Sequence, residues 1–197
     1  MTPDQAPDRL ITVAAAALRG GAGVLQLRHK QLARGDLLVL ARRLRDLTRE
    51  AGALLVINDH VDLALLSEAD GVHLGADDLS VAAARRIASD RLLIGASAST
   101  PEAALAAIAS GADYIGCGPA FATPLKPQKA VIGPGGVAAV TTAVGKPVPV
   151  FAIGGIDASN IRRLIAAGVR RACVVRAVGE AADPEAAARE LRAMLEA

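Results

Sequence analysis

Basic and acidic side chains follow three successive short apolar runs of the sequence, and their types suit phosphate and a divalent cation. Arg28 and Lys30 follow the first run, Asp59 follows the second, and Asp78 lies shortly after the third. Guanidinium and ammonium groups bind phosphate oxygens through charge-assisted hydrogen bonds. Carboxylates on neighbouring strands offer the oxygen ligands that Mg²⁺ prefers, and Mg²⁺ often bridges to substrate phosphates. The pattern therefore predicts a site for magnesium and a phosphorylated ligand.

Further polar residues stand at similar points later in the chain. Ser97 closes the fourth run, and the irregular segment after the fifth run carries Thr123 and Lys126. The pair Gly154 and Gly155 leaves backbone N–H groups uncovered before a helix, which suits a second phosphate. The sequence has no pattern of a nucleophile–histidine–acid triad, a zinc cluster or a Walker loop. The chemistry indicated is electrostatic rather than nucleophilic.

Each of these residues also has a purely structural interpretation. Taken alone, Arg28 and Lys30 are better explained as solvated surface charges, and Asp59 is explained equally well as the cap of a helix over 61–67. Asp77 and Asp78 could cap the following helix, and Gly154 and Gly155 could form a tight turn without a ligand. Ser97 could be a small residue that only fills space, and His73 could be a hydrogen-bonded residue in the wall of the sheet. Cys117 and Cys173 could pack as small hydrophobic residues. A functional site is favoured over these structural roles because nearly every polar residue that interrupts the apolar pattern falls at the same end of a predicted strand.

The elements that must position these residues alternate along the chain. Seven runs rich in Val, Ile and Leu are typical of strands buried on both faces of a parallel sheet. They cover residues 23–28, 54–58, 71–74, 92–96, 114–117, 148–152 and 172–175. Eight segments have helical spacing of apolar residues, among them 8–19, 35–51, 61–67, 80–89, 101–110, 158–167 and 184–196. Ser80, Thr100 and Asp183 are the predicted N-caps of three of these helices.

The count of elements distinguishes between two α/β architectures. Seven strands and eight helices match an eight-stranded α/β barrel better than a doubly wound sheet of five or six strands. We expect a single (β/α)8 TIM-barrel domain over residues 1–197, with its first strand lying upstream of Met1. The longest irregular segment, residues 120–136, is rich in Pro and Gly and is expected to be a functional loop.

Composition excludes several classes of protein. Hydrophobic residues make up 52% of the chain and aromatic residues 2%, so an aromatic platform for nucleic acid is not expected. The net charge of +2, without blocks of one sign, argues against binding of polyanions. No apolar stretch is long enough to span a membrane, and the first residues lack the pattern of a signal peptide. We expect a cytoplasmic protein with no nucleic-acid or membrane partner.

Five stretches of the chain together resemble the thiamine-phosphate synthase family. They run in order and at compatible spacing, from about Leu10 to the C-terminus. The stretches are residues 23–30 (GVLQLRHK), 57–59 (IND), 69–75 (ADGVHLG), 111–119 (GADYIGCGP) and 152–156 (AIGGI). The resemblance implies an α/β barrel enzyme, a transferase that requires Mg²⁺. It would join hydroxymethylpyrimidine diphosphate to a thiazole phosphate, giving thiamine phosphate and pyrophosphate.

The resemblance also implies a role for each matching position. Gln26 would contact the pyrimidine. The diphosphate would be held by Arg28, Lys30, Asn58 and Lys126, with Ser97 and Thr123 supporting its geometry. Asp59 and Asp78 would bind Mg²⁺, and Gly155, Val175 and Arg176 would face the thiazole phosphate. The implied mechanism is dissociative: pyrophosphate departs under cationic stabilisation, in which Arg28, Lys30, Lys126 and Ser97 take part, and the thiazole nitrogen captures a pyrimidine-methyl cation.

Four departures from the family pattern keep other functions open. The family's opening strand is not seen before Met1, Leu125 replaces a threonine, Ser99 a histidine and Arg176 a serine. A thiazole tautomerase shares the fold, but its characteristic histidine is replaced here by Pro119. A non-catalytic barrel that binds thiazole or thiamine phosphate is a third reading, and a sugar-phosphate isomerase a fourth. The oligomeric state is open, and a homo-oligomer is compatible with the resemblance.

Overall fold

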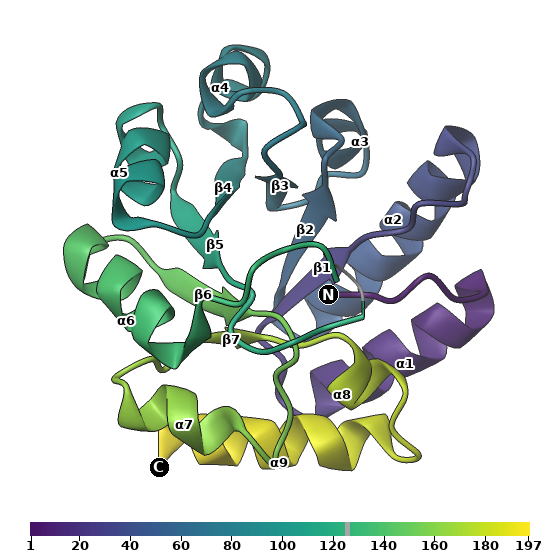
Figure 1. Cartoon of the computed structure of the whole chain (residues 1–197). Helices are drawn as coiled ribbons and strands as arrows, with labels where there is room; N and C mark the ends of the chain where they lie inside the picture. The colour runs from purple at the N-terminus through teal and green to yellow at the C-terminus, as the bar shows by residue number, and fades with distance from the viewer. Residues whose placement is uncertain (125–126) are drawn as a thin grey trace.

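The computed structural model describes residues 1–124 and 127–197, in which strands and helices alternate (Figure 1). The strands are β1 (Val24–Leu27), β2 (Leu54–Asn58), β3 (Gly71–Leu74), β4 (Leu93–Ala98), β5 (Tyr114–Cys117), β6 (Val150–Ile153) and β7 (Ala172–Cys173). The helices are α1 (Pro7–Arg19), α2 (Arg34–Glu50), α3 (Val61–Leu66), α4 (Val81–Ala88), α5 (Pro101–Ala109), α6 (Gly133–Val144), α7 (Ile161–Ala166), α8 (Arg176–Gly179) and α9 (Pro184–Glu196). A 3-10 turn, Ser89–Arg91, follows α4.

The seven strands form one parallel sheet in chain order, from β1 to β7. The sheet curls on itself, and helices surround its outer side (Figure 1). Alternate strand residues face these helices, and Leu55, Ile57, Val72, Ile94 and Ile115 are completely buried. The predicted number and parallel direction of the strands are confirmed.

Side chains of β3, β5 and β6 fill the inner side of the curled sheet. The rings of Tyr114 and Phe151 meet edge to face with centroids 5.7 Å apart, and the ring of His73 lies 5.6 Å from that of Tyr114. Glycines make room for these rings, because a methyl group at Gly95 would lie 2.0 Å from Tyr114 and one at Gly116 would lie 2.8 Å from His73. The sheet therefore encloses a packed interior, as in α/β barrels.

The predicted helix caps are confirmed. The side-chain oxygens of Ser80, Thr100 and Asp183 each accept the backbone N–H of the residue three positions on, at 3.0 to 3.2 Å. Each bond satisfies one of the N–H groups that the first turn of a helix leaves unpaired. The first residue of each of the helices α4, α5 and α9 is therefore the one that directly follows the cap predicted from the sequence.

Several boundaries differ from the sequence prediction. The predicted last strand over 172–175 is reduced to Ala172–Cys173, and the short helix α8 begins at Arg176. The described residues therefore contain nine α-helices rather than eight. The predicted helix over 158–167 begins only at Ile161, because Asp157 forms a turn in which its carboxylate accepts the Ser159 N–H and hydroxyl. The irregular segment after β5 ends where α6 begins, at Gly133.

The first residues of the chain lie between the two edges of the sheet. The Thr2 N–H donates to the Gln26 carbonyl on β1 at 2.8 Å, and the Met1 nitrogen donates to the Val174 carbonyl after β7 at 3.0 Å. Figure 1 shows the N-terminus at this position, and Thr2 is buried. The edges β1 and β7 are thus bridged by residues that precede α1.

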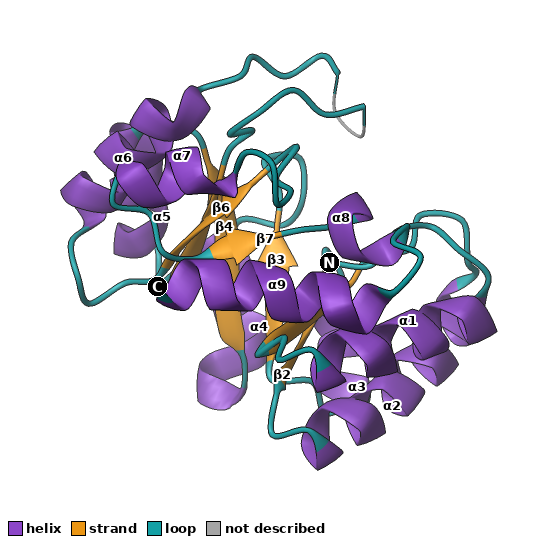
Figure 2. Cartoon of the chain, turned by 90° about the horizontal axis from the view of Figure 1, so that it is seen from below, coloured by secondary structure: helices purple, strands orange, loops and turns teal. Residues whose placement is uncertain are grey.

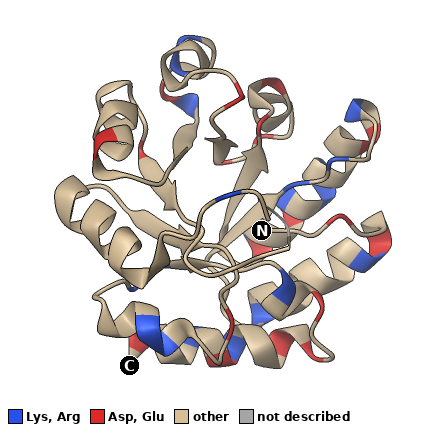
Figure 3. Ribbon diagram, viewed as in Figure 1, with Lys and Arg blue, Asp and Glu red and all other residues tan. Residues whose placement is uncertain are grey.

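The outer layer closes where the last helix meets the first. Figure 2 shows α9 running alongside α1, and Gly20 makes the approach close, since a methyl group there would lie 2.5 Å from the Glu185 carbonyl oxygen. Charged residues gather on helices such as α2 and α9, whereas α6 carries none (Figure 3). Among the described residues, no helix combines the length and apolarity that a membrane span requires.

Candidate phosphate and metal site

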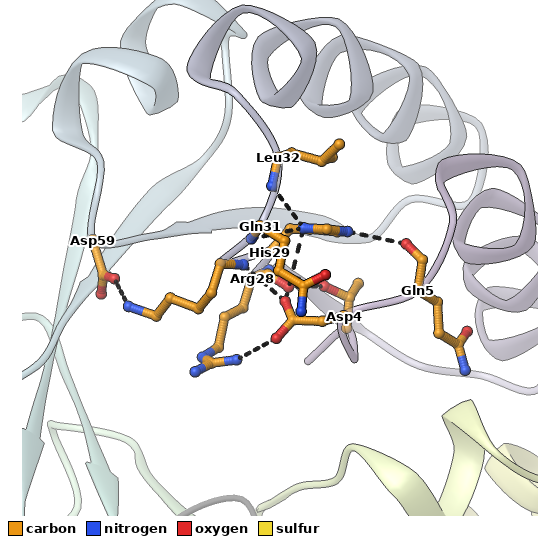
Figure 4. A network of polar contacts seen from close by, with 9 residues as sticks. Asp4, Gln5, Arg28, His29, Gln31, Leu32 and Asp59 are labelled. Carbon is orange, nitrogen blue, oxygen red and sulfur yellow. Dashed lines mark hydrogen bonds and ion pairs between the residues drawn. The ribbon is translucent and has the colours of Figure 1, made fainter.

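A cation and two carboxyl groups meet at the carboxyl ends of β1, β2 and β3. Lys30 follows β1, Asp59 directly follows β2, and Asp78 lies in the loop after β3. Lys30 Nζ lies 2.7 Å from Asp59 Oδ2 (Figure 4), and the side chains of Asp59 and Asp78 are hydrogen-bonded to each other. Parallel strands end at one edge of the sheet, so residues distant in the sequence meet there. We call Lys30, Asp59 and Asp78 the carboxylate cluster.

The backbone of Asp59 has an uncommon conformation that directs its side chain into the cluster. Its φ is +67°, in the left-handed region that Asp tolerates better than most residues. Its N–H donates to the His73 carbonyl at 2.9 Å, which fixes the turn against β3. The N-cap residue of α3 is His60, and no side chain caps that helix. The alternative role of Asp59 as a helix cap is therefore wrong, and backbone strain of this kind is common at functional sites.

Asp78 is likewise not a helix cap. Ser80 caps α4, whereas Asp78 Oδ2 accepts the Gly75 N–H at 2.8 Å. This bond holds the carboxyl group beneath the turn that follows β3. A methyl group at Gly75 would lie 2.9 Å from the same oxygen, so the glycine allows the approach. The loop after β3 is thus shaped to present Asp78 toward Asp59.

The two carboxyl groups have pKa values displaced in opposite directions. For Asp59, partial burial favours the neutral form, but hydrogen bonds from Asp78 and Lys30 and the Lys30 charge outweigh it and lower the pKa. For Asp78, burial and the neighbouring Asp59 raise the pKa against the opposing Gly75 N–H. Two carboxyl groups that compete for one proton mark a place where a cation would be stabilised.

The cluster fits Mg²⁺ by the chemistry of its donors. Among the described residues, no group of three or more His, Cys, Asp and Glu residues is arranged to hold a metal ion. Mg²⁺ does not require such a group, because it keeps several water ligands and is commonly held by one or two carboxylates and substrate phosphates. Asp59 and Asp78 would supply these two carboxylates. Lys30 would then be released toward an anionic ligand.

The other residues predicted on β1 and β2 lie beside the cluster. Arg28 is half-buried after β1, with Nη1 3.5 Å from Asp4 Oδ2 (Figure 4). Gln26 is half-buried two positions earlier, where alternation places it on the same side of β1. Asn58, the last residue of β2, is half-buried and pairs in register with His73. The structure therefore brings these three residues to the same end of the sheet.

Ser97 belongs to a hydrogen-bonded network on the inner side of the sheet. Its hydroxyl lies 3.0 Å from His73 Nε2, and His73 Nδ1 lies 3.2 Å from the Tyr114 hydroxyl. Burial raises the pKa of Tyr114 well above its ordinary value, so the phenol stays protonated. The alternative role of Ser97 as a mere filler is thus replaced by a defined polar contact, which orients its hydroxyl.

The glycine pair after β6 packs closely against the loop after β5. Both glycines have positive φ, +101° at Gly154 and +62° at Gly155. A methyl group at Gly155 would lie 2.3 Å from the Ala122 carbonyl oxygen, and one at Gly154 would lie 2.6 Å from Pro119 Cβ. Close packing alone therefore requires glycine at both positions, as the tight-turn alternative holds. The predicted contact of Gly155 with a phosphate remains a prediction.

Arg176 lies at the start of α8 and contacts an acidic residue of the next turn. Val175 is the N-cap residue of α8, and Arg176 Nη1 lies 4.0 Å from Glu180 Oε2 across one turn. The Arg176 side chain is 45% exposed, so this pair stabilises the helix little. The side chain is therefore available to a ligand at the ends of β6 and β7.

The segment after β5 carries the remaining predicted residues. Lys126, together with Leu125, lies outside the described residues. Thr123 is described, two positions before them. The segment is tied to β6 by two backbone bonds, from the Ala120 N–H to the Ile153 carbonyl at 2.8 Å and from the Phe121 N–H to the Gly154 carbonyl at 3.0 Å. Its base thus lies at the same edge of the sheet as the carboxylate cluster.

Two residues that support the site were not predicted from the sequence, Asp4 before α1 and Tyr114 at the start of β5. Asp4 binds the backbone of Lys30, and Tyr114 completes the network of Ser97 and His73. Tyr114 could have been found, because it is one of three aromatic residues and alternates with the helix-facing Ile115. Asp4 gives no such signal, since nothing in residues 1–6 indicates which part of the chain they contact.

These observations define an α/β protein with a curled parallel sheet that presents basic residues and a pair of carboxylates at the carboxyl ends of its strands. The family model of thiamine monophosphate synthase matches residues 1–178. A protein of Chloroflexus aurantiacus named thiamine-phosphate synthase is 48% identical over 181 residues, which cover 91% of this chain and 82% of that protein. The chain belongs to the thiamine monophosphate synthase family.

Other relatives are longer than this chain. The thiamine-phosphate synthase of Thermosynechococcus vestitus is 47% identical over 184 residues, and the match covers 93% of this chain but only 52% of that protein. The chain thus spans about half the length of such relatives. The structure of a thiamine phosphate pyrophosphorylase from Pyrococcus furiosus is 40% identical, with a TM-score of 0.87, and the match covers 94% of this chain and 89% of that one. A 3-hexulose-6-phosphate synthase at 19% identity and a TM-score of 0.76 shares the fold alone.

Proposed function

We propose that this chain catalyses the last coupling step of thiamine phosphate synthesis, the transfer of a hydroxymethylpyrimidine from its diphosphate to a thiazole phosphate, with release of pyrophosphate. The observation that carries the proposal is the carboxylate cluster of Lys30, Asp59 and Asp78 in a member of this family. A leaving diphosphate needs cations around its oxygens, and the cluster provides a mobile one in Lys30. The Lys30 side chain is 54% exposed although its charge is paired.

The chain's residues would act mainly by binding and by electrostatics. Arg28 and Lys30 would hold the departing diphosphate, with Asn58, Thr123, Lys126 and the oriented hydroxyl of Ser97 completing the contacts. Gln26 would bind the pyrimidine ring. Asp59 and Asp78 would hold Mg²⁺, which when bound neutralises charge on the leaving diphosphate. Lys30 would then leave Asp59 for a phosphate oxygen.

The second substrate would bind on the β6–β7 side. Gly155, Val175 and Arg176 would face the thiazole phosphate. The bond between the pyrimidine methylene carbon and the diphosphate oxygen would break first, with its electron pair leaving on pyrophosphate, and the thiazole nitrogen would then bond to the resulting cationic carbon. No proton has to be removed, which agrees with the absence of an acid–base triad in the sequence. Exclusion of water protects the cationic carbon, and a covering segment after β5 suits this task.

The proposal extends to the fold and the location. Met1 and Thr2 bridge β1 and β7, and we infer that this end of the chain completes a barrel of the TIM type at the site edge. A cytoplasmic location is part of the proposal, and the free thiols of Cys117 and Cys173 are compatible with a reducing compartment.

Incubation of the chain with both substrates and Mg²⁺ tests the proposal directly. We expect thiamine phosphate and pyrophosphate in equal amounts, with product formation lost on chelation of the metal and restored by added Mg²⁺. Omission of either substrate is the control. Binding of thiazole phosphate without any product would favour a non-catalytic phosphate-binding barrel instead.

A further inference from the structure

The loop between β1 and α2 carries two cations of the site on a short, irregular backbone. Residues 28–33 connect the strand to the helix, and Arg28 and Lys30 are two positions apart. Loops that carry binding residues need a rigid support, because a displacement of about 1 Å at a reacting group costs about 100-fold in rate. The support of this loop is a set of hydrogen bonds with the segment that precedes α1 (Figure 4).

His29 binds both its own loop and that segment. Its side chain is only 6% exposed. Nδ1 accepts the backbone N–H groups of Gln31 at 3.3 Å and Leu32 at 3.2 Å, and Nε2 lies 3.0 Å from the Gln5 carbonyl oxygen. With backbone N–H donors at Nδ1 and a carbonyl oxygen at Nε2, the ring is placed to accept at Nδ1 and to donate from Nε2. His29 therefore shapes the turn after Lys30 and also anchors it to Gln5.

Asp4 binds the same loop from the other side. Its Oδ1 accepts the Lys30 backbone N–H at 2.8 Å, and its Oδ2 lies 3.5 Å from Arg28 Nη1. The Thr2 hydroxyl adds bonds of 2.9 Å to both the N–H and the carbonyl of Arg28. Arg28 and Lys30 are thus held at the backbone, while their charged ends stay partly exposed.

We propose that His29 and Asp4 form a clasp that joins residues 4–5 to the loop after β1 and thereby positions Arg28 and Lys30 for the pyrimidine diphosphate. The inference rests on the proposed function, because it takes the diphosphate as the ligand of these two cations. In this proposal neither clasp residue touches the ligand: His29 acts through the backbone of the loop, and Asp4 acts through the Lys30 N–H and its contact with the Arg28 guanidinium. Loss of the clasp should weaken diphosphate binding and spare the thiazole phosphate, which lies on the β6–β7 side.

Paired substitutions separate the two halves of the clasp. His29→Asn keeps an acceptor near the position of Nδ1 and loses the bond to Gln5, whereas His29→Gln keeps a donor near the position of Nε2 and loses the turn. Asp4→Ala removes the acceptor of the Lys30 N–H, and Asp4→Asn restores it without the charge. Asp8→Ala is the matched control, since Asp8 lies nearby on α1, is exposed and pairs only with Arg43 at the surface.

We expect Asp4→Ala and both His29 variants to raise the KM for the pyrimidine diphosphate about 10- to 100-fold, the range seen when supporting residues are removed from ligand-binding groups. The KM for thiazole phosphate should stay within about twofold, and Asp4→Asn should recover most of the loss. Amide hydrogen exchange at Lys30, Gln31 and Leu32 should speed up in the affected variants. Asp8→Ala should change none of these measurements.

Two results would overturn the clasp. Faster exchange at residues 30–32 with both KM values unchanged would show that the loop needs no support, and an equal rise in both KM values with a lowered Tm would show a general structural role. The wild-type assay tests the proposed function independently of the clasp, because that function fails if no thiamine phosphate forms. In that case the clasp is tested by calorimetric binding of pyrophosphate in the presence of Mg²⁺. Equal pyrophosphate affinity in Asp4→Ala and wild type would contradict the clasp on its own.

Discussion

Aspartates stand at both ends of the parallel sheet, and their partners differ. At the amino end, Asp70 precedes β3 and Asp113 precedes β5. Asp70 Oδ2 accepts the Leu55 N–H of the neighbouring strand at 2.7 Å and pairs with Arg45 at 2.6 Å. Asp113 Oδ2 repeats the arrangement with the Ile94 N–H at 2.7 Å and Arg85 at 2.6 Å. These carboxylates fasten one strand to the next.

The arginine partners at the amino end are fixed in turn. Arg85 donates to the carbonyls of Ser89, Leu92 and Gly111 at 2.8 to 2.9 Å, in addition to Asp113. A cavity of about 480 Å³ opens beside it, lined by the Arg85–Asp113 pair and by Asp70. A guanidinium bonded to three carbonyls has little capacity left for a ligand. This end of the sheet contributes stability, as the amino ends of barrel strands generally do.

At the carboxyl end the aspartates bind other side chains. Asp59 contacts Lys30 and Asp78, and within residues 1–124 and 127–197 the only backbone bond to a cluster carboxylate is that from Gly75 to Asp78. Side-chain partners can exchange when a ligand arrives, whereas strand N–H groups cannot. The contrast indicates that an ion pair can take part in function when a ligand can replace one of its two members. Exposure agrees with this, since Lys30 is 54% exposed and Arg45 only 16%.

The largest expected effect is that of Asp59→Ala. Removal of a carboxylate from the cluster should lower Mg²⁺-dependent formation of thiamine phosphate at least about 100-fold, because a bound metal supplies several kcal/mol of charge stabilisation. Steady-state rates across a Mg²⁺ titration measure the change, with Asp62→Ala as the control, since Asp62 is exposed on α3 and pairs only with Arg34. The protein should stay folded with a modestly lowered Tm, because alanine tolerates the left-handed backbone of this position less well than aspartate. Full activity in Asp59→Ala would contradict the assignment of this end as the functional one.

Asp70→Ala should have the opposite profile. The substitution leaves the Leu55 N–H and the largely buried Arg45 without their shared acceptor, and Arg45 is only 16% exposed. We expect the free energy of unfolding to fall by about 2 to 3 kcal/mol, the cost of leaving such groups unsatisfied. Urea unfolding measures it, and both KM values of the folded enzyme should be unchanged. Asp70→Asn retains an acceptor and should lose less. A selective loss of substrate affinity in Asp70→Ala would break the comparison.

Arg176→Ser tests whether the β6–β7 side belongs to the functional end. Arg176 pairs only loosely with Glu180, at 4.0 Å, so its loss should cost almost no stability. If it binds the thiazole phosphate, the KM for that substrate should rise about 10-fold, since a guanidinium binds phosphate through two hydrogen bonds. The KM for the pyrimidine diphosphate should not change. Arg170→Ser, at an exposed position before β7, is the control. Unchanged values for both substrates would make Arg176 a surface charge.

The sequence predicts well what depends on local patterns. Periodicity predicted seven parallel strands, and Ser80, Thr100 and Asp183 cap the predicted helices. Polar residues at the ends of consecutive strands predicted the meeting of Lys30, Asp59 and Asp78, because the ends of parallel strands share an edge. Topology is implicit in such patterns, and no side-chain detail is needed.

The sequence predicts poorly what depends on contacts between distant segments. Nothing in residues 1–5 indicates that Thr2 and Asp4 bind the loop after β1, 24 or more positions away. The glycine pair 154–155 illustrates the same limit, since only the structure shows that the loop after β5 requires glycine there. The short helix α8 was missed because four residues carry too little periodicity to distinguish it from the end of a strand.

The smallest effect concerns Cys117, the last residue of β5, which is completely buried. Burial raises the pKa of its thiol from 9.0 to about 11, so the folded chain keeps this proton at pH values where the unfolded chain has lost it. The folded state is then the one that binds more protons, and stability must fall as the pH rises from about 9 to about 11. Cys117→Ala lacks this contribution.

We therefore expect the stability advantage of the wild type over Cys117→Ala to shrink by about 1 to 2 kcal/mol between about pH 8.5 and about pH 10.5, and to stay constant below about pH 8. Urea unfolding of both proteins across this range measures the difference, and other alkaline groups cancel in the comparison. Activity near neutral pH should be retained in Cys117→Ala, because a buried, protonated thiol facing the helices takes no part in the site. A pH-independent difference would show that the thiol is solvated in the folded chain. Loss of activity without loss of stability would mean that this buried residue at the carboxyl end of β5 contributes to the site.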